Sequence, residues 1–495
     1  MINLSSFIRF HALRTPTRVA LTYQGADISY GELFERIIQL AGYLEAKDIG
    51  PGDVVGVLMK NSPAFLEIAF AVSHVGAVFL PINYRLAASE VNYICKDSDA
   101  SLLFADHELV DSDIECRTIV IDTALQSSTL DLSTGCTPAQ MVQRVPTDLF
   151  RLMYTSGTTD RPKGVMHSYE NFHWKCTDHV VVLGLTAETR LLVTGPLYHV
   201  GAFDLPGVAV LWQGGMLAIL REFDPKTALE AIQDQALNSA WLAPVMTSGL
   251  LEFPERDQFD LTSMRWVIGG GERTPEQRIR AFSSCFTNAR YIDAYGLTES
   301  CSGDTFMEAG REIEKIGSTG PATPHVEIEI RDDDGRTLSA GETGEICLRG
   351  PKIFKSYWRD PDKTKASFFG DWFRTGDVGH LDEDGFLYIT DRKKDLIISG
   401  GENVASSEVE RVIQELPEVS EVAVIGKPDE RWGEVPVAVV VCAEGATVDL
   451  AAIDSHCRAS LAAFKVPKQL VLREQLPRNP SGKILKRELR EQLGL

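Results

Sequence analysis

The sequence predicts an α/β protein with a large N-terminal domain of stacked parallel-sheet α/β subdomains, a small antiparallel barrel-like unit and a smaller α+β C-terminal domain. Helix-like segments alternate with short, fully apolar segments, which indicates parallel strands covered on both faces. Turns rich in glycine and proline follow several of these strands directly, where α/β proteins bind ligands. Between residues 322 and 349 the pattern changes to short alternating strands, which predicts a separate antiparallel unit.

The N-terminal residues show the helix–strand alternation. Ser29 and Glu32 form an S-x-x-E pattern that can cap a helix with apolar residues at helical spacing. A strand over 54–59, a helix over 63–75 and a strand over 77–80 are expected next. The same alternation continues through residues 181–194, 216–220 and 265–268.

The last third of the chain changes in character. Val326 to Ile330 alternates in polarity and precedes an Asp-Asp-Gly turn, and a further turn and strand are expected over 382–390. The charged segment 391–395 separates a self-contained remainder, so we place the domains at 1–391 and 392–495. Within the second domain we expect strands near 395–398, 421–425, 435–442 and 469–473, and helices near 407–415, 449–461 and 482–492.

Charge excludes some classes of partner. The chain has 495 residues, with 49 Lys and Arg against 70 Asp and Glu, giving a net charge of −21. Nucleic acid binding needs a cationic surface that releases counterions, so neither nucleic acid nor an anionic membrane surface is expected as a partner. A small polyanion needs only a local cationic site.

Cysteines and apolar segments indicate the compartment. The nine cysteines are scattered without a C-x-x-C pair, which is typical of reduced thiols, so we expect a cytoplasmic protein. No secretory signal is visible at the start, and the longest apolar stretch, 64–82, contains Glu67 and His74. We therefore expect no integral membrane segment, and a homodimer is an assembly to test.

The most informative local feature is the segment from Tyr154 to Val165, which is rich in hydroxyl groups and glycine. Backbone N–H groups and hydroxyls of such a loop can surround phosphate oxygens, and Lys163 adds a positive charge. It does not fit the G-x-x-x-x-G-K-[ST] pattern. A flexible linker is the alternative, but the apolar residues on both sides favour a turn between strands.

This loop resembles the phosphate-binding loop of the adenylate-forming superfamily, which includes acyl-CoA synthetases, firefly luciferases and the adenylation domains of peptide synthetases. Five further motifs match in order: Gly269-Gly270-Gly271-Glu272, Tyr295-Gly296-Leu297-Thr298-Glu299, Trp372-Phe373-Arg374-Thr375-Gly376-Asp377, Asp391-Arg392-Lys393-Lys394-Asp395 and Pro480-Ser481-Gly482-Lys483.

The resemblance implies an ATP site and an acid site. Lys483, Thr298, Glu299 and Lys163 would act in catalysis, with Glu299 holding Mg²⁺ and Asp377 and Arg392 holding the ribose. His199 would position the acid rather than transfer a proton. The complete implied ATP- or AMP-binding set is Thr155, Ser156, Gly157, Thr158, Thr159, Lys163, Gly270, Gly271, Glu272, Asp293, Ala294, Tyr295, Gly296, Thr298, Asp377, Arg392 and Lys483. The implied acyl pocket comprises His199, Tyr198, Phe203, Trp241 and Gly269. For each of these side chains an ordinary structural role is the alternative.

The resemblance also implies a second half-reaction with coenzyme A. The C-terminal domain would be mobile and turn about a hinge at Lys394, and Gly400, Gly401, Glu402 and His199 would line the pantetheine path. The chain departs from the family pattern at Asp160 in the phosphate loop, at Asp391 before the hinge arginine, and at Ala405-Ser406-Ser407.

The leading interpretation is an AMP-forming acyl-CoA synthetase that uses ATP, Mg²⁺ and coenzyme A and acts on a hydrophobic carboxylic acid. A medium- or long-chain fatty acid is the first expectation, and an aryl or polycyclic acid is the alternative. An adenylating enzyme that loads a carrier protein, luciferase-like oxidation and a catalytically silent nucleotide-binding protein are the other interpretations.

Substitution of Lys483 tests the implied catalytic lysine. Adenylation joins two anions, a carboxylate and the α-phosphate, so a cation touching both lowers the barrier. We expect Lys483→Ala to lose nearly all carboxylate-dependent pyrophosphate release from Mg-ATP. Undiminished release in this variant would contradict the assignment.

Overall fold

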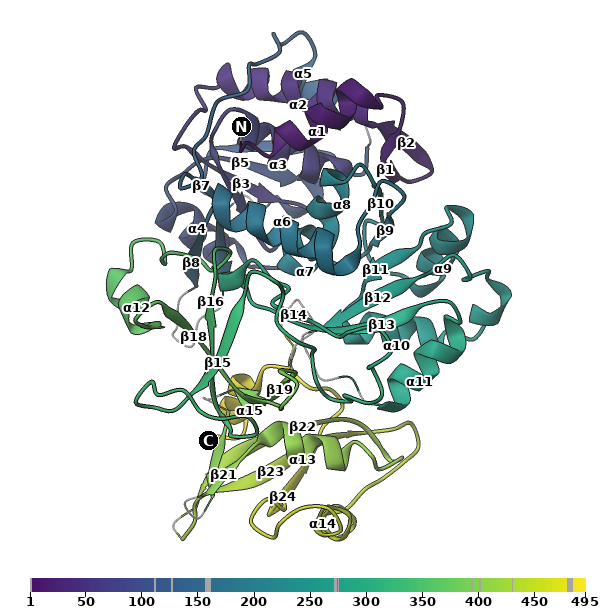
Figure 1. Ribbon diagram of the computed structural model, residues 1–495, viewed down its shortest axis with the longest axis vertical. Coiled ribbons are helices and arrows are strands. Elements are labelled where there is room, and N and C mark those ends of the chain that lie inside the picture. The colour runs from purple at the N-terminus through teal and green to yellow at the C-terminus, as the bar shows by residue number, and fades with distance from the viewer. Residues whose placement is uncertain are drawn as a thin grey trace. The chain divides into compact units, whose positions relative to one another are not determined.

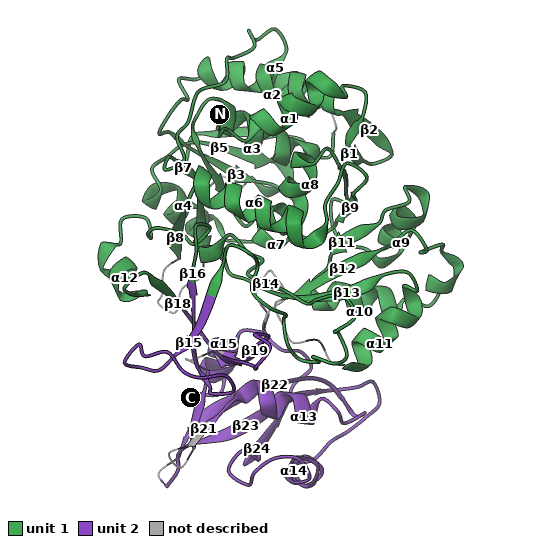
Figure 2. Ribbon diagram, viewed as in Figure 1, with its two compact units in different colours: residues 1–327, 349–373 green, residues 328–348, 374–495 purple. Residues whose placement is uncertain are grey.

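The computed structural model describes residues 2–110, 113–125, 128–155, 162–270, 274, 276–392, 395–399, 402–429, 431–478 and 484–495. These residues form two compact units, coloured separately in Figure 2. The first comprises residues 1–327 and 349–373, and the second comprises residues 328–348 and 374–495.

One sheet of the first unit contains six strands in the order β6-β5-β3-β4-β7-β8. Figure 1 labels β3, β5, β7 and β8 of this sheet. All pairs are parallel except β7 with β8. Its strands are β3 (Val54–Leu58), β4 (Val78–Pro81), β5 (Ala100–Asp106), β6 (Thr118–Ile121), β7 (Leu149–Thr155) and β8 (Lys163–Ser168). The apolar strands expected at 54–59 and 77–80 are therefore present as β3 and β4.

The other large sheet contains eight strands in the order β14-β13-β12-β11-β9-β10-β1-β2. The six central strands are parallel, and an antiparallel strand closes each edge. Its strands are β1 (Val19–Tyr23), β2 (Ala26–Ser29), β9 (Arg190–Val193), β10 (Met216–Ile219), β11 (Ser239–Trp241), β12 (Trp266–Gly270), β13 (Arg290–Tyr295) and β14 (Thr305–Phe306).

Helix α2 (Tyr30–Glu45) begins as the sequence predicts. The Ser29 hydroxyl accepts from the Glu32 N–H, and the Glu32 carboxylate accepts from the Ser29 N–H, which forms a capping box. The helix packs against α1, α3 and α5. The helical elements of the first unit are α1 (Ser5–Arg14), α2, α3 (Pro63–His74), α4 (Ala88–Asp97), α5 (Ser128–Ser133), α6 (Tyr169–Leu183), α7 (Val200–Ala202), α8 (Val208–Trp212), α9 (Pro225–Asp234), α10 (Pro244–Glu252), α11 (Glu276–Cys285), α12 (Pro361–Ala366), η1 (His107–Leu109), η2 (Phe203–Gly207), η3 (Arg256–Gln258) and η4 (Thr298–Ser300).

The expected antiparallel unit is also present. Strands β15 (Glu327–Arg331), β16 (Gly344–Arg349) and β18 (Trp372–Leu381) follow one another in the sheet, and β19 (Leu387–Arg392) pairs antiparallel with β18. The short strand β17 (Phe368–Phe369) pairs with the start of β18.

The C-terminal part of the second unit is a small α+β fold. Strands β22 (Val419–Asp429) and β23 (Gly433–Cys442) form its long antiparallel centre, and β24 (Gln469–Leu472) runs parallel to β23. Strands β20 (Ile397–Ser399) and β21 (Glu402–Val404) complete the sheet, with helices α13 (Ser406–Ile413), α14 (Leu450–Arg458) and α15 (Lys486–Gln492). A core of buried valines and isoleucines lies between this sheet and α13 and α14.

These observations confirm the predicted fold class. The proposed domain boundary at 391/392 stays a prediction, and the compact division assigns residues 328–348 and 374–391 to the second unit. Among the described residues, no helix combines the length and the apolar character needed to cross a bilayer.

Candidate active site

The implied acid- and adenine-binding residues follow neighbouring strands of the eight-stranded sheet. Strand β9 ends at Val193, β11 at Trp241, β12 at Gly270 and β13 at Tyr295. Because these strands are parallel, their carboxyl ends lie at one edge of the sheet, where α/β folds bind ligands. This edge therefore brings segments far apart in the sequence together.

The glycines of the implied adenine turn are required by close packing. Gly269 and Gly270 lie opposite Asp293 and Ala294 in the parallel pair of β12 and β13. A methyl group at Gly269 would overlap the hydroxyl of Tyr291, so a larger residue does not fit there. The structure thus places Gly269, implied for the acyl pocket, beside residues implied for the ATP site. Gly271 and Glu272 lie outside the described residues.

Tyr295 and Gly296 begin a tight turn after β13. The Asp304 N–H donates to the Tyr295 carbonyl at 2.7 Å, and the Tyr295 side chain is buried, with 8% of its surface exposed. A methyl group at Gly296 would overlap the backbone of Gly303. The turn carries Thr298 and Glu299 in η4, and both are half-buried.

The two ends of the implied phosphate loop are paired. Thr155 ends β7 directly opposite Lys163, which begins β8. Ser156, Gly157, Thr158, Thr159 and Asp160 lie between them, outside the described residues. Burial and the neighbouring Lys363 lower the pKa of Lys163, while Asp360 and Glu299 act in the opposite direction. Lys163 and Glu299 are thus close enough to interact electrostatically.

Glu299 is held by residues that lie more than fifty positions further along the chain. The Tyr357 hydroxyl donates to Glu299 Oε1 at 2.9 Å, and the Phe354 N–H donates to the Glu299 carbonyl at 2.8 Å. Burial and the Glu299 carboxylate raise the pKa of Tyr357, so its hydroxyl stays a donor. A half-buried carboxylate fixed beside a lysine fits Mg²⁺ bound to nucleotide phosphates, because Mg²⁺ takes one or two carboxylates together with phosphate oxygens.

The backbone of Thr298 is held by a histidine of the six-stranded sheet. Its carbonyl lies 2.7 Å from Nε2 of His167, a fully buried residue of β8. His167 in turn contacts Arg151 of β7. Both strands also carry an end of the implied phosphate loop, so the backbone of the Thr298–Glu299 turn is tied to them.

His199 is a neutral hydrogen-bond donor at pH 7. Its Nδ1 accepts from the Gly201 N–H at 3.1 Å, which leaves the proton on Nε2. Burial lowers the pKa of His199 below its ordinary value, although Asp204 acts in the opposite direction. A neutral donor can orient a carboxylate without neutralising its charge.

The other implied acyl-pocket residues divide into two groups. The Trp241 ring lies against the backbone of Gly195 and Gly201, where no side chain larger than hydrogen fits. The buried Tyr198 hydroxyl has no hydrogen-bond partner among the described residues, and its ring meets Tyr84 edge-on at 5.4 Å. Phe203 packs into the aromatic core instead, against Phe65, Phe79 and Phe172. Its role in the pocket stays a prediction.

In the second unit, the two implied ribose contacts are cross-strand partners. Asp377 of β18 lies opposite Arg392 of β19, and the Asp377 side chain is largely buried. The Asp377 N–H donates to the Thr375 hydroxyl at 3.0 Å. Glu402 pairs with Ser399 in the hairpin of β20 and β21. Lys394, Gly400, Gly401 and Lys483 lie outside the described residues, so their roles stay predictions.

Two departures from the family pattern contact each other. The Asp391 carboxylate accepts from the backbone N–H of Ser406 at 2.6 Å and from the Ser406 hydroxyl. Ser406 is the first residue of α13 and is buried. The acidic residue before the hinge arginine therefore satisfies a donor at the start of the helix, which explains both substitutions together.

Sequence reasoning did not identify Tyr357, His167 or Arg151. Tyr357 and Glu299 are 58 positions apart, and His167 and Thr298 are 131 apart, so no local spacing relates them. One signal was present: Arg151 and His167 are polar residues inside otherwise apolar strands. A buried strand contains such residues only when they have partners.

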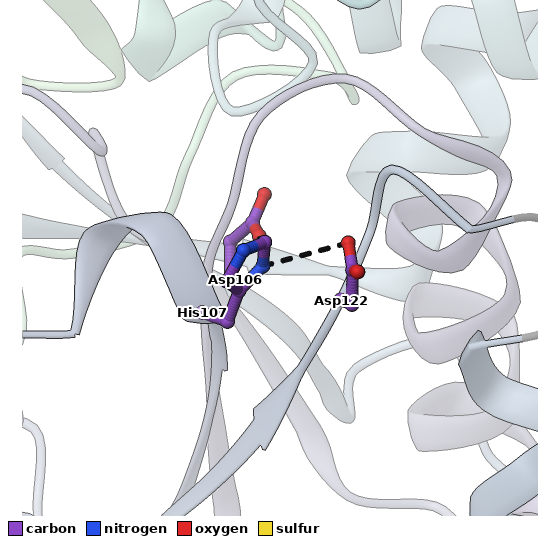
Figure 3. A group of neighbouring side chains, drawn as sticks. All are labelled: Asp106, His107 and Asp122. Carbon is purple, nitrogen blue, oxygen red and sulfur yellow. Dashed lines mark ion pairs between the residues drawn. The ribbon is translucent and has the colours of Figure 1, made fainter.

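A separate polar cluster contains Asp106, His107 and Asp122 (Figure 3). His107 Nδ1 lies 3.3 Å from Asp106 Oδ1 and 3.4 Å from Asp122 Oδ1. Arg221, which follows β10, pairs with Asp106 at the end of β5 at 2.7 Å. Because this guanidinium already compensates the buried Asp106, we assign the cluster a structural role, which joins the end of β5 to the segment after β10.

Comparison with known proteins identifies the family. The sequence model of the AMP-binding enzyme family matches residues 8–358, and that of the AMP-binding enzyme C-terminal domain matches residues 408–483. The chain therefore belongs to the AMP-binding enzyme family. Within it, the chain is an AMP-forming acyl-CoA synthetase, an acid–thiol ligase that uses ATP, Mg²⁺ and coenzyme A.

Similar proteins extend over the whole chain. A feruloyl-CoA synthase from Amycolatopsis sp. is 35% identical, covering 98% of this chain and 97% of its own. The long-chain-fatty-acid–CoA ligase FadD13 from Mycobacterium tuberculosis is 36% identical, covering 99% of each chain. The structure of o-succinylbenzoate CoA synthetase from Bacillus subtilis, in complex with its acyl-adenylate intermediate, has a TM-score of 0.89 at 30% identity and covers 98% of this chain and 97% of its own.

Removal of the Tyr357 hydroxyl tests how Glu299 is held. Loss of a group that orients a metal-binding carboxylate weakens metal affinity about 10- to 100-fold. We expect Tyr357→Phe to raise the Mg²⁺ concentration for half-maximal CoA-thioester formation by about 10-fold or more, at saturating ATP. The control Tyr43→Phe, on α2, should leave it unchanged. An unchanged Mg²⁺ requirement in Tyr357→Phe would contradict this contact's role.

Proposed function

We propose that this enzyme activates a hydrophobic monocarboxylic acid, with a medium- or long-chain fatty acid as the first candidate. The observation that carries the proposal is the placement of the neutral donor His199 next to Trp241, whose ring lies on the Gly201 backbone. A carboxylate held by this donor would project its tail along apolar and aromatic side chains. The identity with FadD13 supports a fatty acid.

An aryl acid is the second candidate. The Trp241 ring lies against Gly195 and Gly201, and Tyr198 presents a second ring, so both can stack on an aromatic substrate. The similarity to feruloyl-CoA synthase supports this alternative. The two candidates differ in the acid that the pocket accepts, not in the chemistry.

In the first half-reaction, a carboxylate oxygen of the acid attacks the α-phosphorus of ATP. The α–β phosphoanhydride bond breaks, and pyrophosphate leaves with the electron pair of that bond. Lys163 would stabilise the charge on the phosphates, and Thr298 would bond the α-phosphate. Mg²⁺ bound to Glu299 would neutralise phosphate charge.

Asp377 would accept from the ribose hydroxyls, and Arg392 would be the second ribose contact. The cross-strand pairing of these two residues supports a shared ligand. Lys483 would contact both the carboxylate and the α-phosphate. These roles follow from the family resemblance and are proposals for this chain.

In the second half-reaction, the coenzyme A thiolate attacks the acyl carbonyl of the adenylate. The new C–S bond forms, the C–O bond to AMP breaks, and AMP leaves with the electron pair of that bond as a phosphate dianion. Gly400, Gly401 and Glu402 would line the pantetheine path after the C-terminal domain turns about Lys394.

We also propose that the enzyme works in the cytoplasm as a homodimer. All nine cysteines are free, including Cys95, Cys176, Cys301, Cys347 and Cys457 in buried positions, which supports a reducing compartment. Light scattering on the purified protein would establish the oligomeric state.

A panel of acids tests the substrate class. We expect CoA thioesters from fatty acids of medium or long chain, measured by mass spectrometry with free coenzyme A. Aryl thioesters alone would favour the second candidate. Absence of a CoA thioester from every fatty acid in the panel would overturn the first candidate.

Trp241→Ala tests the pocket itself. Removal of the indole should raise the ratio of kcat/KM for a bulky polycyclic acid to kcat/KM for the preferred acid by about 10-fold or more. The reason is that the contacts of a pocket side chain discriminate between substrates by factors of this size. The matched control is Trp266→Ala, at the amino end of β12, which should leave the ratio unchanged. An unaltered ratio in Trp241→Ala would place the acid elsewhere.

A further inference from the structure

A cluster of buried charged groups lies directly behind the Thr298–Glu299 turn. Arg151 donates from its two terminal nitrogens to Asp204 Oδ1 at 2.9 Å and Asp204 Oδ2 at 2.8 Å. Lys175 of α6 donates to the Asp204 carbonyl at 3.1 Å. All three side chains are 1% exposed or less. The cluster therefore joins β7, α6 and the segment that follows His199.

Aromatic rings enclose the guanidinium. The Arg151 carbon Cζ lies 5.8 Å, 5.3 Å and 5.7 Å from the ring centroids of Phe150, Phe172 and Phe203. These rings exclude water, so the charges must be compensated by their protein partners. A guanidinium in such a setting has one stable orientation, set by the carboxylate it pairs with.

The same guanidinium determines the tautomer of His167. Arg151 Nε and Nη2 lie 3.1 Å and 3.0 Å from His167 Nδ1. A guanidinium has only donors, so Nδ1 must be an acceptor without a proton. The proton of the neutral ring is therefore on Nε2, which donates to the Thr298 carbonyl at 2.7 Å. Burial and the Arg151 charge keep the pKa of His167 well below its ordinary value.

These contacts form one continuous path between two parts of the site. Asp204 belongs to η2, directly after the His199 segment, and fixes one side of the Arg151 guanidinium. The other side of the guanidinium fixes His167, which holds the backbone of Thr298, the residue before Glu299. Arg151 thus contacts both His167, which holds the backbone of Thr298, and Asp204, which follows the His199 segment.

We propose that Arg151 and His167 are positioning residues that set the Mg-ATP geometry of the Thr298–Glu299 turn and tie it to the acid-binding segment through Asp204. The proposal rests on the proposed roles of Thr298 and Glu299 in holding ATP and Mg²⁺. A merely structural cluster would affect stability alone. A positioning cluster changes the affinity for Mg-ATP and Mg²⁺ in variants that remain folded.

The experiment compares two substitutions of His167 that differ in which contact they keep. In His167→Gln, the side-chain amide reaches the Nε2 position and can still donate to the Thr298 carbonyl. In His167→Asn, the shorter amide reaches only the Nδ1 position, so it can accept from Arg151 but does not reach Thr298. The two variants therefore separate the Thr298 contact from the Arg151 contact.

We expect His167→Asn to raise both the KM for Mg-ATP and the Mg²⁺ concentration for half-maximal activity by about 10-fold. Loss of a contact that orients a metal-site residue typically lowers metal affinity by about this factor. His167→Gln should restore both values to near the wild type. Equal values in the two variants and the wild type, with only a lowered melting temperature, would overturn the proposal.

Two further variants make the result specific. His74→Asn removes another buried histidine, which contacts the Ser5 hydroxyl at 2.9 Å and the Ala139 carbonyl at 3.3 Å, and should change neither value. Glu299→Gln tests the proposed function separately. If Glu299→Gln leaves the Mg²⁺ dependence unchanged, the proposed role of Glu299 fails. If it raises the Mg²⁺ requirement and His167→Asn does not, the positioning role of His167 fails.

A measurement on the wild type covers the case in which His167→Asn does not fold. Nitrogen-15 NMR of histidine-labelled protein, with the His167 signals assigned by their loss in His167→Gln, reports the tautomer directly. We expect a neutral ring protonated on Nε2 throughout pH 5.5 to 8, a range chosen to bracket the ordinary histidine pKa of about 6.5. Protonation on Nδ1, or titration within that range, would overturn the proposal.

Discussion

The ion pair between Arg151 and Asp204 is the interaction on which the proposed support of the Thr298–Glu299 turn depends. Both side chains are fully buried, and the pair is bidentate. Removing one partner of such a pair typically lowers the free energy of unfolding by about 3–5 kcal/mol, because the remaining charge is then buried without a partner. The first unit therefore reaches its native packing only when β7, α6 and η2 bring these groups together.

The two large sheets bring these groups close to residues proposed for the catalytic site. The eight-stranded sheet presents Trp241, Gly270 and Tyr295 at its carboxyl edge, and the six-stranded sheet presents both ends of the phosphate loop in β7 and β8. His167 of β8 donates to the Thr298 carbonyl. The six-stranded sheet therefore supports the turn that follows β13 of the eight-stranded sheet. Positioning by rigid strands is more accurate than positioning by loops alone.

A net charge of −21 does not prevent the binding of ATP, because the positive charge is placed locally. Lys163 lies at the end of the phosphate loop, and burial together with Lys363 lowers its pKa. Two lysines close together repel each other, and a bound polyphosphate would relieve that repulsion. The acidic surface elsewhere affects solubility and the choice of partner.

Local sequence patterns predicted much of the fold, and short motifs supplied the proposed site residues. The capping box at Ser29 and the apolar strand β3 depend on neighbours within a few positions, so periodicity identifies them. Motif residues such as Thr298 and Asp377 were identified because the family resemblance is carried by short segments. The supports of these residues could not be predicted, because Tyr357 and His167 meet their partners only through the tertiary fold.

A double-mutant cycle between Arg151 and His167 tests whether the two residues act on Thr298 through one path. The cycle compares kcat/KM for Mg-ATP in the wild type, Arg151→Lys, His167→Asn and the double variant. If the two residues act through one path to Thr298, the double variant should be no more impaired than the worse single variant, because the second substitution removes a contact already lost. If the fold-losses in kcat/KM of the two single variants multiply in the double variant, the two residues act independently, which would contradict a shared path to Thr298.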